Sequence, residues 1–245
     1  MHEITNSLTP DAVVLDLGAG QGSFDYSNTK FKIKAVDLTP PTKPFSENVE
    51  FVKADASNLP FEDGYFDVVF ANWTLEHFIN IDSCISEVRR VLKKDGLFYC
   101  SVPDSCGIED KIYRRVYKNS HVQKFNFESF VKMLYANKFQ IVSFSDWSSG
   151  FNYCHDHNKL KRIHDLTIKI TKKVDQKFKT KLSRCGWIFL SKAVDEVGLK
   201  TAPFNICKKC GSGIPYSQIT ESFWICPNCK KRNLSFKPPN DFEWV

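Results

Sequence analysis

The sequence predicts an α/β fold, in which helices flank one mostly parallel β-sheet and a small cysteine-rich module follows. Over the first ~145 residues, short runs of β-branched residues alternate with stretches of helical periodicity, as expected for βαβ units that feed one sheet. Near residue 199 the composition changes to short pieces punctuated by glycine and proline. We therefore expect two domains, residues 1–198 and residues 199–245.

Each expected element follows from its local pattern. A helix is expected over residues 80–94, where apolar side chains recur every three or four positions and Gly96 follows as a stop. A second helix is expected over residues 127–137. Residues 155–184, with 10 basic and 3 acidic side chains, are interpreted as a basic helical insertion. The expected strands are residues 12–17, 32–37, 49–53, 66–71, 96–102, 139–147 and 186–193.

Charge is divided unevenly along the 245 residues, whose formal net charge is +6. Residues 1–110 hold 9 basic and 18 acidic side chains, whereas residues 111–245 hold 25 basic and 10 acidic ones. A basic half of this kind suits a polyanionic partner. No run of apolar residues approaches the ~18 needed to span a membrane, and the N-terminus lacks the features of a secretory signal. A cytoplasmic location is the resulting expectation.

A glycine-rich loop follows the first expected strand. It contains Asp16, Gly18, Gly20 and Gly22, and Asp37 ends the second expected strand. Glycines let backbone N–H groups approach a ligand closely, and a carboxylate at the second strand can accept hydrogen bonds from ribose hydroxyls. Because Ser23 stands where a dinucleotide site has its third glycine, the spacing favours S-adenosylmethionine over NAD.

Five blocks of the sequence, taken in order and spacing, resemble class I S-adenosylmethionine-dependent methyltransferases, particularly the small-molecule group that includes quinone-biosynthesis enzymes. The resemblance implies a Rossmann-like methyltransferase fold with a mostly parallel sheet of seven strands. The blocks are residues 14–22, 36–38, 54–61, 66–77 and 87–97.

The resemblance also implies a set of cofactor-binding residues. Asp16, with Gly18 and Gly20, would hold the amino-acid part of the cofactor. Asp37 would bind the ribose hydroxyls, and Leu38 would pack on the adenine face. For the adenine amino group and the sulfonium end the residues are Asp55 with Ala56, and Asn72 with Trp73.

The acceptor and a base that would deprotonate it are less well marked. Residues 71–74 lack the motif with which amino-methylating nucleic-acid enzymes grip a base. His77 and His155 are the candidate catalytic bases, and both have a competing structural interpretation. His121 is a further candidate base, and a structural role is the simpler interpretation for it. Residues 155–184 are equally well explained as a lid over the acceptor or as a solvated helix.

Nine cysteines, an odd number, include two close pairs. Cys207 and Cys210 are separated by fifteen residues from Cys226 and Cys229, the spacing of two knuckles around one tetrahedral Zn²⁺. We expect a zinc ribbon whose metal is structural, because four cysteines leave no open position for water. Basic and aromatic residues lie around the knuckles and suit either nucleic-acid binding or solubility.

The function expected from the sequence is methyl transfer from S-adenosylmethionine to a small-molecule, sugar or lipid-linked acceptor. One alternative is an RNA methyltransferase that binds nucleic acid or another polyanion through residues 155–184 and 205–237. A second alternative is an adaptor that binds S-adenosylmethionine without turnover. The family resemblance favours the small acceptor, and the basic charge favours RNA.

Overall fold

The computed structural model describes most of the expected sheet domain and part of the cysteine-rich module. The described residues are 1–116, 121–147, 166, 169–171, 173, 174, 177, 184–197, 203–207, 209–214 and 223–234. Most of the basic insertion, including the candidate base His155, lies outside them. No helix among the described residues is long and apolar enough to cross a membrane.

Seven strands form one sheet in the order β3-β2-β1-β4-β5-β7-β6. All neighbouring pairs are parallel except those of β7, which runs antiparallel to β5 and to β6. The predicted fold class is therefore confirmed. The strands are β1 Val13–Leu17, β2 Lys32–Asp37, β3 Val49–Lys53, β4 Phe66–Asn72, β5 Leu92–Pro103, β6 Phe139–Trp147 and β7 Gly186–Ala193.

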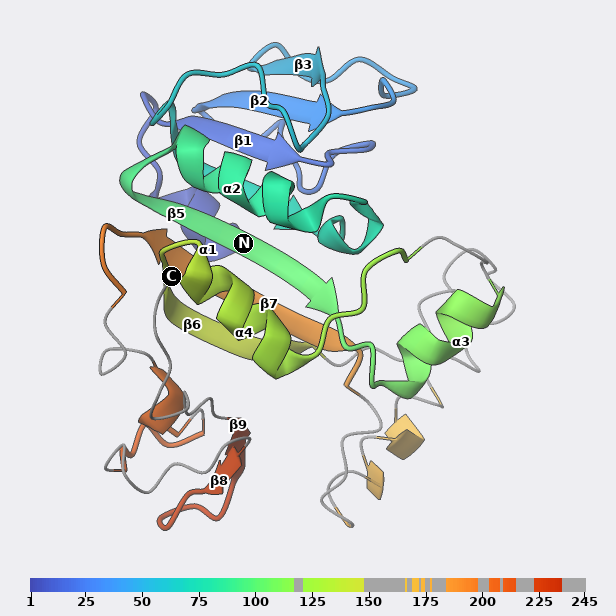
Figure 1. Cartoon of the computed structure of the whole chain (residues 1–245), viewed down its shortest axis with the longest axis vertical. Helices are drawn as coiled ribbons and strands as arrows, with labels where there is room; N and C mark the ends of the chain where they lie inside the picture. The colour runs from blue at the N-terminus through green and yellow to red at the C-terminus, as the bar shows by residue number, and fades with distance from the viewer. Residues whose placement is uncertain are drawn as a thin grey trace.

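Helices cover both faces of this sheet, with α2 and α4 on one side and α1 on the other (Figure 1). The expectation of a helix over residues 80–94 is wrong at its end, because the helix stops at Val91. Leu92 is buried and begins β5, where it pairs with Phe66 at the start of β4. Two helices, α1 and α3, were not expected. The α-helices are α1 His2–Ser7, α2 Ile81–Val91, α3 Ile108–Val116 and α4 Phe127–Ala136.

Two apolar clusters hold the helices on the sheet. Under α2 and α4, Ile85, Val88 and Phe130 pack on the inner strands and are fully buried. On the opposite face, Ile4 of α1 packs beside a cluster that includes Phe70 of β4. Asn126 precedes α4 and caps it, because its side chain accepts a hydrogen bond from the Ser129 backbone N–H. In return, the Ser129 hydroxyl oxygen accepts a hydrogen bond from the Asn126 backbone N–H. Packing of both faces fixes where the strands end, and hence where the site lies.

The described residues between 203 and 234, here called the cysteine module, pack near β6 (Figure 1). They contain a short 3-10 helix η4 (Pro203–Asn205) and a hairpin of β8 (Phe223–Ile225) and β9 (Arg232–Leu234). Phe204 is buried, with its ring 5.3 Å from Phe144 of β6. The division at residue 198 stays a prediction, but the module shares a core cluster with the sheet.

Candidate functional site

A cavity of about 450 Å³ opens where the carboxyl ends of β1, β2 and β4 meet. The sheet order reverses between β1 and β4, and crevices at such points bind ligands in open α/β folds. Seven residues expected from the sequence to form the site line this one cavity: Gly18, Asp37, Leu38, Asp55, Ala56, Trp73 and His77. Others that line it were not expected, among them Thr74, Phe78 and Asn80.

The loop after β1 requires glycine at position 18. Gly18 has φ +67°, and a Cβ there would lie 1.9 Å from Thr74 Oγ1. Its N–H donates to the Val36 carbonyl at 2.8 Å, which ties the loop to β2. The absence of a side chain therefore keeps this end of the cavity open.

Asp16 holds the same loop from below and is not among the cavity-lining residues. Its carboxylate is fully buried and accepts hydrogen bonds from the Ser23 N–H at 3.0 Å, the Ser23 hydroxyl at 2.7 Å and the Tyr26 hydroxyl. Burial raises the pKa of Asp16, and these three donors oppose that rise. Asp16 therefore shapes the loop.

Asp37 links the loop to the second strand. Its Oδ2 accepts the Gly20 N–H at 3.0 Å, and its Oδ1 accepts the Thr39 N–H at 2.9 Å. Gly20 itself, with φ +52°, lies outside the residues lining the cavity. Asp37 is half-buried and lines the cavity beside the exposed Leu38, so a carboxylate and an apolar side chain stand together there.

Asp55 supplies a second carboxylate to the cavity. The backbone N–H and the hydroxyl of Ser57 both donate to Asp55 Oδ1 at 2.8 Å, and they hold the pKa of Asp55 below its ordinary value. The group is thus a hydrogen-bond acceptor at neutral pH. Ala56, next to it, is buried.

The end of β4 forms the other wall. Asn72 lies outside the lining and accepts the Ser101 hydroxyl at 2.8 Å, while Ser101 Oγ accepts the Trp73 N–H at 2.9 Å. Trp73 has φ +53°, a left-handed conformation that non-glycine residues seldom adopt. Its ring lies against Gly186, where a Cβ would approach it to 2.8 Å.

A second cavity, of about 250 Å³, lies on the far side of Trp73 and His77, which line both spaces. This cavity was not expected from the sequence. The block that contains His77 does place Glu76 beside it, but nothing in the sequence marks the residues of the unexpected helix α3. The remaining lining residues are Glu76, Pro103, Asp110, Tyr113, His121 and Cys185.

The second cavity contains an unusual set of ionisable groups. His121 Nδ1 lies 2.6 Å from Asp110 Oδ1, and Arg114 Nε donates to Asp110 Oδ2 at 2.5 Å. Burial opposes ionisation of Asp110, but the hydrogen bonds from His121 and Arg114 outweigh it and hold its pKa below the ordinary value. Burial raises the pKa of Glu76 to about 8. Among the described residues, nothing hydrogen-bonds Glu76 Oε2.

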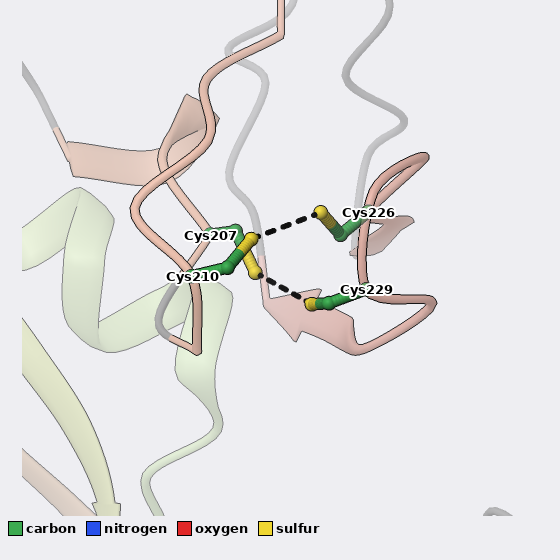
Figure 2. Close-up of side chains that lie close together, drawn as sticks. All are labelled: Cys207, Cys210, Cys226 and Cys229. Carbon is green, nitrogen blue, oxygen red and sulfur yellow. Dashed lines mark hydrogen bonds between the residues drawn. The ribbon is translucent and has the colours of Figure 1, made fainter.

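The four paired cysteines of the cysteine module come together, two from each pair facing the other two (Figure 2). Cys207 Sγ lies 3.5 Å from Cys229 Sγ, and Cys210 Sγ lies 3.6 Å from Cys226 Sγ. All four sulfurs lie within 4.8 Å of one another. A Zn–S bond of ~2.3 Å in a tetrahedron places sulfurs about 3.8 Å apart, so the four residues fit one zinc ion.

Residues 15–100 match the model of the family described as Methyltransferase domain. The uncharacterized methyltransferase YcgJ of Bacillus subtilis (strain 168) is 28% identical over 158 residues, 57% of this chain and 62% of that protein. The crystal structure of B. subtilis YcgJ superimposes with a TM-score of 0.56 at 22% identity, covering 79% of this chain and 96% of that one.

A shorter match, at higher identity, is to the ubiquinone/menaquinone biosynthesis C-methyltransferase UbiE of Brucella anthropi. It is 43% identical over 58 residues, 24% of this chain and 22% of that protein. The chain thus spans 62% or less of the length of these curated relatives. Residues 15–100 are similar to a methyltransferase domain, and the sheet has the Rossmann-like methyltransferase fold.

Proposed function

We propose that this chain is an S-adenosylmethionine-dependent methyltransferase that acts on a small-molecule, sugar or lipid-linked acceptor. One observation carries the proposal: a glycine loop and two carboxylates share a single cavity at the point where the sheet order reverses. The cofactor would supply a methyl group already activated on sulfur. The residues of the chain then need chiefly to hold the two reactants in line.

Each cavity residue has a role suited to this cofactor. Asp37 would accept hydrogen bonds from ribose hydroxyls, and Leu38, 62% exposed, offers an apolar surface to adenine. Asp55 would accept a hydrogen bond from the adenine amino group, since its lowered pKa keeps it ionised. Gly18 would approach the amino-acid part closely, and Trp73 would cover the sulfonium end.

Three of the other predicted residues would act from outside the lining of the cavity. Asp16 would hold the loop through Ser23 and Tyr26, and the Gly20 N–H would orient Asp37. Asn72 would support Trp73 through Ser101.

A small acceptor is favoured by the second cavity, which measures about 250 Å³ and shares Trp73 and His77 with the first. The relatives support the same class, since UbiE is named for quinone biosynthesis. The alternative of an RNA acceptor rests on the basic charge of residues 155–184 and 205–237, much of which lies outside the described residues. The small acceptor is therefore the proposal.

Calorimetric titration with S-adenosylmethionine tests the cofactor site. We expect Asp37→Ala to weaken binding at least tenfold, because hydrogen bonds to a charged group contribute ~1.5–3 kcal/mol each. Asp11→Ala is the matched control, because Asp11 lies before β1 at the opposite end of that strand and should leave affinity unchanged. Equal affinity of the wild type and Asp37→Ala would refute the assignment.

An assay with tritiated methyl donor and fractionated cell extract tests turnover and acceptor class together. We expect label in the small-molecule or lipid fraction. Label in RNA would favour the nucleic-acid alternative. Cofactor binding without label in any fraction would favour the adaptor.

We also propose that Cys207, Cys210, Cys226 and Cys229 hold one structural Zn²⁺. The sulfur separations support it, as does Ser212, whose hydroxyl lies 3.3 Å from Cys210 Sγ and is the largest of several contacts that lower the pKa of that thiol. A thiol of low pKa is ready to bind metal as the thiolate.

A further inference from the structure

The second cavity has the features of an acceptor site that carries its own base. It opens on Trp73 and His77, the residues that also border the proposed cofactor cavity, so a molecule bound there lies next to the cofactor. The cavity measures about 250 Å³, whereas ~150 Å³ holds one benzene ring. A substituted single ring therefore fits.

The position of the His121 proton follows from its partner. Asp110 is 3% exposed, and its lowered pKa makes it a carboxylate, which can only accept hydrogen bonds. The contact of 2.6 Å from His121 Nδ1 to Asp110 Oδ1 therefore places a proton on Nδ1. Whenever the ring is neutral, Nε2 therefore carries the lone pair, in the arrangement of a general base oriented by a carboxylate.

The surroundings hold this pair rigidly. Arg114 bonds Asp110 and also donates to the His121 and Gln123 carbonyl oxygens, so α3 and the segment after it are joined at one point. Tyr113 stacks on the His121 ring, with centroids 4.3 Å apart and planes at 27°. The imidazole thus cannot rotate away from the cavity without breaking several contacts.

Glu76 approaches His121 from the other side. Its Oε1 lies 4.0 Å from His121 Nε2, which is too far for a direct hydrogen bond. One oxygen atom of a bound methyl acceptor could contact both groups at once. Because burial raises the pKa of Glu76 to about 8, its carboxyl is largely protonated at neutral pH and can donate a hydrogen bond. An oxygen bound in the gap would meet a lone pair on one side and a donor on the other.

We propose that His121, positioned by Asp110, is the general base for an acceptor whose methylated atom is the oxygen of an acidic hydroxyl, such as a phenol or enol. This inference rests on the proposed methyltransferase function. The acceptor O–H bond breaks and its proton passes to His121 Nε2. The oxygen electron pair forms the new O–CH₃ bond while the C–S bond breaks, and its electron pair stays on sulfur as a neutral thioether. The imidazolium then loses its proton to solvent.

The hydroxyl class is favoured by the chemistry of the walls. Trp73, His77 and Tyr113 supply flat rings that suit an aromatic acceptor. The cavity holds a base for a proton, whereas methylation of a sulfide or a tertiary amine requires none. His121 therefore has a catalytic role in this proposal, and Asp110 is a positioning residue.

The test uses 4-nitrophenol, whose anion is yellow, as a probe of the base. The full-length protein is first saturated with S-adenosylhomocysteine, and binding of that compound is verified by calorimetry. The probe is then titrated at pH 6, where much of it is un-ionised in free solution. We expect the wild type to bind the probe as the anion, with a rise in visible absorbance.

Two variants and one control separate the roles. His121→Gln keeps a polar side chain but no base, and should bind the probe ten- to a hundredfold more weakly with no rise in absorbance. Asp110→Asn should retain S-adenosylhomocysteine binding, which reports a folded protein, while losing most of the absorbance change. His2→Gln, on the exposed part of α1, should behave as the wild type.

Three results would overturn the inference. The first is that the wild type leaves the probe unbound, the second that it binds the probe un-ionised, and the third that His121→Gln still ionises the probe. Ionisation that requires added Mg²⁺ would instead assign the site to a metal bound by Glu76, His77 and His121, whose ligand atoms lie within 4.8 Å of one another. If S-adenosylhomocysteine itself fails to bind the wild type, the methyltransferase proposal falls first.

Discussion

The cysteine module and the methyltransferase sheet should unfold together, and Phe204→Ala tests this coupling. The Phe204 ring is 1% exposed and lies 5.3 Å from Phe144 and 6.1 Å from Phe127. Its carbonyl oxygen accepts the Trp224 indole N–H at 2.6 Å. Phe→Ala in a packed core costs ~3–5 kcal/mol, which for a chain of this size lowers the melting temperature by about 6–20 °C.

The assay is urea unfolding followed by far-ultraviolet circular dichroism, combined with hydrogen exchange of β6 peptides. Ile206→Ala is the control, because Ile206 is two residues away and 47% exposed, and it should cost less than about 1 kcal/mol. If Phe204→Ala costs no more than the control, the module is not part of the core. If protection falls in the module alone while β6 is unaffected, the coupling is refuted.

Three further outcomes are expected. Gly18→Ala should abolish S-adenosylmethionine binding in calorimetry, because its Cβ would meet Thr74, whereas Gly64→Ala, at φ +64° with its nearest described neighbour 3.9 Å away, should bind normally. Glu76→Gln should have a higher free energy of unfolding in urea than the wild type, and the difference should grow as pH rises from 5 to 8. The reason is that the raised pKa of Glu76 stabilises the fold at low pH, and this contribution is lost towards pH 8. A difference that is independent of pH would contradict this. Elemental analysis should find one zinc per chain and none in Cys226→Ser, and zinc retained by that variant would count against the four-cysteine site.

The sheet could be predicted because its strands are short runs rich in β-branched and aromatic residues. Residues 32–37 and 139–147 match the bounds of β2 and β6. The end of α2 could not, because Leu92 continues the helical periodicity. Its pairing with Phe66, 26 residues earlier, wins over local propensity.

The candidate site divides in the same way. Local constraints mark Gly18 and Asp37, since a close approach and a strand end both leave a trace in sequence. The pair of Asp110 and His121 leaves none: Asp110 is in α3 and His121 lies 11 residues later, beyond the helix, and only the folded chain brings them together. Asp16 shows the converse, since its position in the motif is plain but its hydrogen bonds go to Ser23 and Tyr26.

Trp73 connects these sites to the end of the basic insertion. Gly186, the first residue of β7, has no Cβ to collide with the Val102 carbonyl at 2.2 Å or with the Trp73 ring. Two residues earlier, Arg184 donates to the Asp104 carboxylate, which is 2% exposed, and its guanidinium lies 5.1 Å from the Trp187 ring centroid. A buried ion pair therefore fixes the chain where it enters β7, and β7 in turn fixes the wall shared by the two cavities. Arg184, the last residue of the segment 155–184, is thus held close to the wall that the proposed acceptor and cofactor cavities share.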